Sequence, residues 1–224
     1  MRKEIYLIQG SGNEDYKAFT TRIAGLVEYI EETFKPSRLK YTITAKAPPT
    51  LSIIPFSKKK LAAVSIEHES NEPVYGLMDA DGFYGAYRVT EALPVSYKKN
   101  WPDGQPTPGA CLLTLFSQKK NIDYPTFIDR WHNSHTPLSL RYHPLWNYNR
   151  NVVEERLNDT SKTFNGIVEE QVRQTSDLLN PFKFFGNPLV ILPRMIHVYL
   201  DTKSFIDYSS METFLVAEYI VKSK

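Results

Sequence analysis

YPTFIDRWHNSHTPLSLRYHPLWNYNRN, residues 124–151, is the stretch from which both the fold and the candidate site follow. It contains three of the five histidines and two of the three tryptophans of the chain. Phe127, Trp131 and His135 recur every four residues, which predicts an amphipathic helix over residues 124–134. The inward face of this helix is therefore expected to end in an imidazole.

This stretch fits the pattern Tyr-x-x-Phe-x-x-x-Trp-x-x-x-His-x-Pro-Leu, which runs from Tyr124 to Leu138. An apolar strand is predicted before it, over residues 110–116, and the strand of residues 147–157 opens with Tyr-Asn-Arg-Asn at 148–151. The pattern resembles the EthD family of the dimeric α+β barrel superfamily. The resemblance covers roughly the C-terminal half, and the tail, with Asp201, Phe205, Asp207 and Glu218, is similar to the ending of that family. It implies a ferredoxin-like unit whose sheet pairs with a second sheet, and a helix histidine beside a cavity.

A second unit of the same kind is predicted in front of the first. Strand patterns fall at residues 3–9, 39–45, 61–68 and 84–97, with a helix at 14–34 and a short helix or loop at 71–81. A short additional strand at 51–56 is considered. Residues 100–109 hold three prolines and two glycines and are predicted to be a linker between an N-terminal half, 1–99, and an EthD-like half, 110–224. The predicted fold class is α+β, with two fused ferredoxin-like repeats pairing as a dimeric-type α+β barrel within one chain.

Composition limits the partners and the compartment. The formal net charge is +2, from 27 basic and 25 acidic residues, so no nucleic-acid partner is expected. The single cysteine, Cys111, excludes a disulfide within the chain, favours a reducing compartment, and lies in an apolar strand where a packed thiol is expected. The sequence has neither a run of about 20 apolar residues nor a signal peptide, so a cytoplasmic protein without a membrane partner is expected.

His135 is the first candidate catalytic residue, because the ordinary pKa of histidine suits proton transfer near neutral pH. The alternative is a helix-end histidine that bonds only to the backbone. Arg141 and Tyr148 are the candidate polar anchors for a substrate. Tyr148 and Asn151 would lie on opposite faces of an alternating strand unless a bulge intervenes.

The candidate substrate-binding residues are Phe127 and Trp131 on the helix, Asn151, and Glu218 in the last strand. Glu218 is expected either outward and solvated or inward with a raised pKa. His132 is expected to face solvent, so no metal site is predicted. His197, in a second helical stretch that Pro193 is expected to bend or break, is predicted to be a core histidine. No cofactor is expected, although a haem held by a histidine, as in some relatives in the superfamily, remains an alternative.

These residues predict an enzyme that binds a small hydrophobic or aromatic molecule and performs acid/base chemistry without a cofactor, as an isomerase, cyclase, dehydratase or decarboxylase. The EthD resemblance implies an alternative, an oxidoreductase-associated protein of an oxidative degradation pathway. A non-catalytic small-molecule-binding barrel is the third option. A cavity lined by His135 and a second titratable group would favour an enzyme. The N-terminal half lacks the histidine motif, so one site per chain is expected. A homodimer is considered as well, because exposed edge strands could pair two chains.

Overall fold

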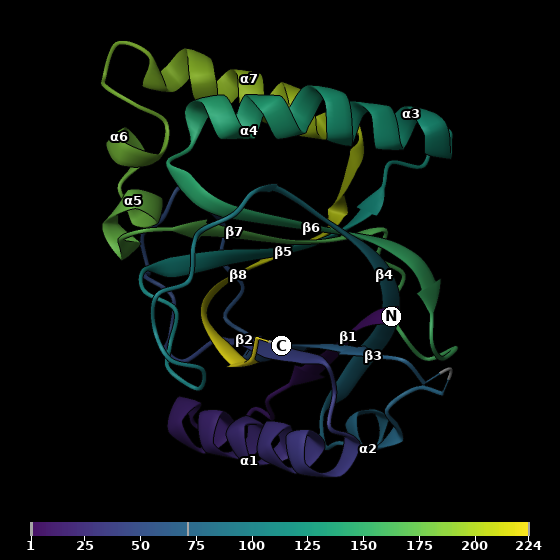
Figure 1. The fold of residues 1–224 in the computed structure, drawn as a ribbon. Coiled ribbons are helices and arrows are strands. Elements are labelled where there is room, and N and C mark those ends of the chain that lie inside the picture. The colour runs from purple at the N-terminus through teal and green to yellow at the C-terminus, as the bar shows by residue number, and fades with distance from the viewer. Residues whose placement is uncertain (1, 71, 224) are drawn as a thin grey trace.

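The computed structural model describes residues 2–70 and 72–223, and within them eight antiparallel strands close into a barrel (Figure 1). Every described strand has a hydrogen-bonded neighbour on both sides, so no edge is left for pairing two chains. The strands in barrel order are β1 (Arg2–Gln9), β3 (Leu61–His68), β2 (Arg38–Ile43), β8 (Ile206–Lys222), β5 (Ala110–Gln118), β7 (Gly166–Val172), β6 (Leu145–Arg156) and β4 (Phe83–Val95).

The barrel consists of two four-stranded sheets with the same internal order. The first sheet runs β4-β1-β3-β2 and the second runs β8-β5-β7-β6, which is the order of a ferredoxin-like repeat in both cases. The sheets join where β2 pairs with β8 and where β4 pairs with β6. The predicted fold class, two fused repeats that form a dimeric-type barrel in one chain, is confirmed.

The N-terminal half packs its helices tightly against the outside of the barrel. Helix α1 (Tyr16–Phe34) begins at Asp15, whose carboxylate accepts a hydrogen bond from the Ala18 amide at 2.7 Å. Its buried side chains are Phe19, Ile23, Val27 and Ile30, which lie against the apolar outer face of the first sheet. The short helix α2 (Tyr75–Met78) completes this half.

The C-terminal half carries its helices on the opposite side of the barrel (Figure 1). One continuous helical stretch comprises α3 (Tyr124–Asp129), a π-helical turn (Arg130–His135) and α4 (Thr136–Tyr142), so the helix runs eight residues beyond the predicted end at residue 134. Pro137 has no amide hydrogen, yet it does not end the helix, because the Thr136 amide bonds to the carbonyl of Trp131 in a wider turn. The remaining helices are α5 (Thr175–Leu179), α6 (Pro181–Phe184) and α7 (Ile191–Lys203).

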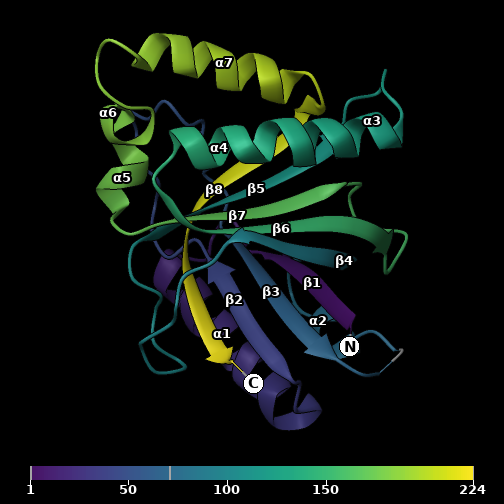
Figure 2. The same ribbon diagram turned by 45° about the horizontal axis from the view of Figure 1, so that its top comes forward.

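Two segments differ from the prediction. Residues 51–56 belong to a loop between β2 and β3 rather than to a strand, and this loop extends to the second sheet (Figure 2). There the Ser57 amide donates to the carbonyl of Thr213 at 2.8 Å, and the Thr213 hydroxyl donates to the carbonyl of Pro55 at 2.7 Å. Helix α7 is continuous rather than broken at Pro193, because that residue falls in its first turn, where proline is tolerated. No helix in the described residues has the length and apolar character needed to cross a membrane.

Candidate functional site

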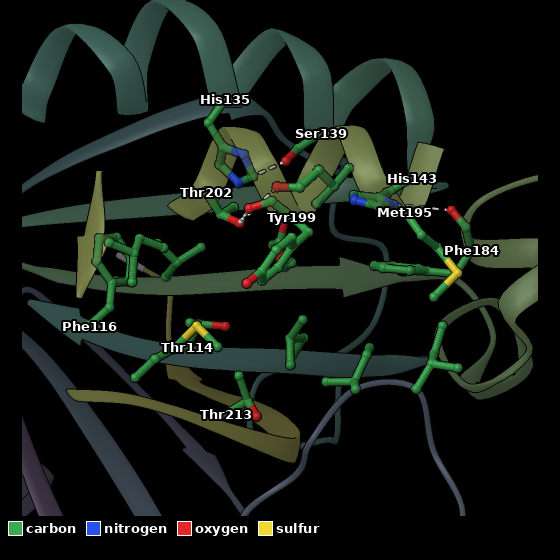
Figure 3. Close-up of a pocket in the computed structure, with 18 of the residues that line it drawn as sticks. Thr114, Phe116, His135, Ser139, His143, Phe184, Met195, Tyr199, Thr202 and Thr213 are labelled. Atoms are coloured by element: carbon green, nitrogen blue, oxygen red, sulfur yellow. Dashed lines mark hydrogen bonds between the residues drawn. The ribbon is translucent and has the colours of Figure 1, made fainter. Parts of the chain in front are cut away.

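A cavity of about 540 Å³ lies between the outer face of the second sheet and helices α4 and α7 (Figure 3). One apolar end of the cavity is formed by Phe116, Trp131 and Phe205. The Phe116 ring contacts each of the other two rings edge to face. Phe184 and Met195 lie toward the other end. The lining is mainly aromatic and aliphatic, so the cavity suits a hydrophobic molecule.

His135 reaches this cavity from the π-helical turn and is held at both ring nitrogens. Its Nδ1 donates to Oδ2 of Asp201 on α7 at 2.8 Å, and Ser134 donates to the other oxygen of that carboxylate at 2.6 Å. The Asp201 contact fixes the Nδ1-protonated tautomer, which leaves Nε2 as a hydrogen-bond acceptor. The hydroxyl of Ser139 donates to Nε2 at 3.1 Å (Figure 3). Burial alone would raise the pKa of Asp201, but the contacts with His135 and Ser134 outweigh it and lower that pKa.

Glu170 of β7 is the second titratable group at the cavity. Cross-strand pairing places it between Leu112 of β5 and Tyr148 of β6, on the face that meets the helices. Among the described residues none forms a hydrogen bond or ion pair with its carboxylate. Burial raises the pKa of Glu170 to about 6, and a positive charge on His135 acts in the opposite direction. Glu170 is therefore poised to exchange a proton near neutral pH.

Further polar groups lie along the cavity. His143 is buried, stacks on Phe184 with ring centroids 4.0 Å apart, and donates from Nδ1 to the carbonyl of that residue at 3.0 Å. Burial lowers the pKa of His143 to about 4, so its ring is neutral at physiological pH. The hydroxyls of Thr202 and Tyr208 lie 2.6 Å apart. These groups can orient a ligand through neutral hydrogen bonds.

The structure brings four of the seven predicted site residues to this region. His135, Trp131 and Tyr148 line the cavity, and Phe127 packs behind them against Trp131 with ring centroids 5.6 Å apart. Burial raises the pKa of Tyr148, so its hydroxyl remains protonated. Arg141 is exposed on α4 and lines no part of the cavity, so it is not placed to anchor a ligand there.

Asn151 and Glu218 lie inside the barrel, on the other side of the sheet from the cavity. Glu218 accepts hydrogen bonds from Lys40 at 3.0 Å and from Thr107 at 2.8 Å, and Asn151 accepts one from Lys3 at 2.7 Å. Glu218 is inward, but the raised pKa expected for an inward glutamate is wrong. Burial does favour a higher pKa, yet the Lys40 ammonium and the hydrogen bonds outweigh it and lower the pKa.

Two other histidines differ from their predicted places. His132 is part-buried beside Trp131 rather than directed to solvent, and burial lowers its pKa to about 4. His197 is exposed and lies 3.0 Å from the Tyr142 hydroxyl, so it is not a core residue. No group of three or more metal-binding side chains occurs among the described residues.

A haem fits this cavity poorly. Both ring nitrogens of His135 already have hydrogen-bond partners, so iron ligation through Nε2 would displace the Ser139 hydroxyl. No lysine or arginine in the described part of the chain lines the cavity, so the carboxylates of a haem would lack cationic partners there. The lack of lysine and arginine among the described lining residues also favours an uncharged ligand.

Three residues of the site were not predicted as site residues: Glu170, Asp201 and Ser139. Asp201 belonged to the EthD-like tail, but nothing in the sequence paired it with a histidine 66 residues earlier. Ser139 lies four residues after His135, which is a helical contact distance and was a usable signal. Glu170 follows Glu169 in a strand whose two faces are both buried, so alternation alone did not show which one faces the helices.

Comparison with known proteins supports the fold alone. No family model matches the chain, and no curated protein does. Among solved structures, an "anthrone oxidase-like protein" aligns with a TM-score of 0.60 at 8% identity and covers 98% of this chain and 91% of its own. A "putative monooxygenase" from Fusobacterium nucleatum subsp. nucleatum aligns with a TM-score of 0.53 at 8% identity and covers 99% of this chain and 92% of its own. The chain is thus similar in fold to these two proteins.

Proposed function

We propose that this protein is a small-molecule oxidative enzyme in which His135 and Glu170 move the protons. The observation that carries the proposal is that a tautomer-fixed imidazole and an unpaired, buried carboxyl group with a pKa of about 6 lie at one apolar cavity. Two titratable groups with different environments are the usual arrangement for acid/base chemistry. This combines the acid/base role expected from the sequence with the oxidative alternative, which the named structural neighbours favour.

The proposed substrate is a neutral, flat aromatic molecule with an acidic C–H group, such as the ring CH₂ of an anthrone. Its aromatic rings would lie against Trp131 and Phe116, and its oxygens would bond to Tyr208 or Thr202. The ionised Glu170 would remove a proton from the CH₂ group, or the unprotonated Nε2 of His135 would do so after releasing its hydrogen bond from the Ser139 hydroxyl. The low polarity of the cavity favours a delocalised anion over a localised charge.

The anion would then react with molecular oxygen. The balanced change at carbon is CH₂ + O₂ → C=O + H₂O, in which the substrate supplies all the electrons. The protein would accept the first proton and return a proton as water leaves. Relationship to the EthD family remains part of this proposal and rests on the sequence pattern from Tyr124 to Leu138.

The test separates proton removal from oxidation. The purified chain is incubated with anthrone in deuterium oxide without oxygen, and exchange at the CH₂ group is followed by nuclear magnetic resonance; oxygen uptake is measured separately. A catalytic acid or base contributes about 10²–10⁴-fold to a reaction rate. At least one of the variants Glu170→Gln and His135→Gln is therefore expected to slow exchange by about 100-fold or more. His197→Asn is the matched control, since that histidine is exposed and outside the cavity. Equal exchange rates in all variants would refute the proposal.

The non-catalytic alternative makes a different prediction. A binding protein would retain ligand affinity in the Glu170→Gln variant and show neither exchange nor oxygen uptake in the unmodified chain. Titrating anthrone against the tryptophan fluorescence measures this affinity, because Trp131 lies at the cavity wall.

A further inference from the structure

The interior of the barrel is divided along its axis into an apolar part and a polar part. Ile5 and Val216 belong to the apolar core of the interior, whereas Lys3 and Glu218, each two residues away on the same inward face, do not. The polar part contains a pocket of about 300 Å³, which is at the lower end of the range for small-molecule sites. No described residue lines both this polar pocket and the cavity beside His135.

The segment that follows β4 helps to enclose the polar pocket. The hydroxyl of Tyr97 donates to Oε1 of Glu218 at 2.5 Å, and the hydroxyl of Thr107 donates to the same oxygen at 2.8 Å. The predicted linker is thus held against the barrel instead of forming a free connection between the halves. Ser96 and Ser223 are exposed residues of the lining, so the pocket opens to solvent between this segment and the end of β8.

Several groups that line the polar pocket have hydrogen-bonding capacity that no described part of the chain uses. Oδ1 of Asn149 and the hydroxyl of Ser65 have no partner, although these residues are only 3% and 4% exposed. The side-chain amide of Asn147, which is 5% exposed, forms no hydrogen bond among the described residues. Lys3 and Lys40 each donate two hydrogen bonds within the chain and keep a third N–H. The pocket therefore offers both free donors and free acceptors.

The charges around the polar pocket balance. Five basic side chains line it, and five carboxylates either line it or form ion pairs with those bases. The bases are Lys3, Arg38, Lys40, Lys99 and Lys222, and the carboxylates are Glu67, Glu91, Asp103, Glu169 and Glu218. An ion that entered the pocket would leave one charge without a counter-charge, which is costly in a buried place.

The free groups select the chemistry of a ligand. A hydroxyl group can accept a hydrogen bond from an ammonium group and donate one to an amide oxygen at the same time. A carboxylate can only accept, so it would leave Oδ1 of Asn149 unpaired, and an ammonium group can only donate. An apolar molecule would leave all of these groups buried without partners. An uncharged molecule with several hydroxyl groups satisfies both the free donors and the free acceptors.

We propose that the polar pocket binds a small, uncharged, polyhydroxylated molecule, that is, a monosaccharide or a polyol. This binding site is separate from the oxidative cavity and does not rest on the proposed function. Glu218, which the sequence predicts to bind a ligand, lines the pocket. Asn151, the other such residue in the interior, holds the Lys3 ammonium group in place at 2.7 Å.

The experiment is a titration of the purified chain with glucose, mannose, galactose and myo-inositol, followed by saturation-transfer nuclear magnetic resonance and by calorimetry. At least one of these compounds is expected to bind saturably with a Kd of about 1 mM or tighter. Glucuronate and glucosamine, the charged counterparts of glucose, are expected to bind more weakly than the neutral compound. Absence of saturable binding by every neutral compound, or tighter binding of a charged one, would overturn the proposal.

Variants place the ligand in the pocket. Ser65→Ala and Asn147→Ala leave the ion pairs intact, and each is expected to weaken binding about fivefold, the usual effect of losing one neutral hydrogen bond. Thr42→Val is the matched control, because Thr42 is an inward, fully buried residue whose hydroxyl also lacks a partner among the described residues but does not line the pocket. Thermal unfolding verifies that each variant is folded.

Two results with these variants would contradict the proposed place of binding. One is an affinity that neither Ser65→Ala nor Asn147→Ala changes, and the other is an equal loss of affinity in Thr42→Val. A crystal structure of the chain grown with the sugar that binds is the direct check. Ordered water alone in the polar pocket of that crystal would overturn the proposal.

Discussion

Replacing Glu170 by glutamine is expected to make the protein more stable at neutral pH while removing its proton exchange. The folded environment raises the pKa of this carboxyl group from 4.5 to about 6 because burial disfavours its charged form. The rise corresponds to about 2 kcal/mol, since one pKa unit is worth about 1.4 kcal/mol. Glutamine has a similar shape and carries no charge, so it avoids this cost.

The sign and the pH window follow from linkage. Below pH 4.5 the carboxyl group is protonated in both the folded and the unfolded chain, and the two proteins are expected to be equally stable. As pH rises from about 4.5, where the unfolded chain ionises, to about 6, where the folded chain does, the unmodified chain loses up to about 2 kcal/mol relative to the variant, and the difference is constant at higher pH. For a domain of this size the advantage of the variant at pH 8 is about 4–8 °C in Tm.

Thermal unfolding followed by circular dichroism at pH 4.5 and pH 8 measures the difference. Glu154→Gln is the control, because Glu154 is exposed on β6 and has no ion pair among the described contacts. If Glu170→Gln and the unmodified chain differ in Tm by the same amount at both pH values, the carboxyl group is not titrating in an apolar site. That result would remove the basis for its role as an acid or base.

Three further outcomes are expected. Trp131→Ala should lower the free energy of unfolding by about 3–5 kcal/mol in urea titrations, because this side chain is 1% exposed; a loss below about 1 kcal/mol would contradict its place in the core. Lys40→Met should cost about 3–5 kcal/mol at pH 7, because it leaves the carboxylates of Glu169 and Glu218 inside the barrel without their cation; equal stability would show that water or another group compensates. Arg141→Gln should leave anthrone exchange unchanged, and a loss of about tenfold or more would return this exposed residue to the site.

Local patterns were sufficient to predict the order of elements and the place of His135. Phe127, Trp131 and His135 are one helical turn apart, so their common direction depends only on residues close in sequence. The repeated order of strands and helices predicted two ferredoxin-like halves, and the closure of their sheets into a barrel was expected from the EthD resemblance. The continuation of the helix past Pro137 did not, because it depends on one wide turn that the spacing of apolar residues does not reveal.

The choice between the two faces of a strand could not be predicted. In most antiparallel sheets a polar face looks at solvent, but all seven residues of β7 are buried because one face meets the barrel interior and the other meets the helices. Glu169 bonds to Lys40 in the interior, whereas its neighbour Glu170 faces the cavity. The same ambiguity led to the selection of Glu218, which lies in the interior, and to the omission of Glu170.

The fused chain explains why the site can be asymmetric. Tyr148 lies opposite Glu170 on the helix-covered face of the second sheet, and Leu39 lies opposite Ile66 on the helix-covered face of the first. Leu39 and Ile66 pack in one apolar core with the buried side chains of α1, so the helix-covered face of the first sheet is filled, whereas that of the second has a cavity.

In a dimer of identical subunits, a change that filled one cavity would fill both. In one chain, the first half is free to lose its cavity and to contribute the β2–β3 loop to the cavity wall of the other. The proposed division is therefore one reactive half and one half that covers its cavity. It predicts that the double variant Ile53→Gln with Ile54→Gln, which places polar groups in the cavity wall, weakens anthrone binding measured by tryptophan fluorescence, whereas Leu51→Gln, outside the lining, leaves it unchanged.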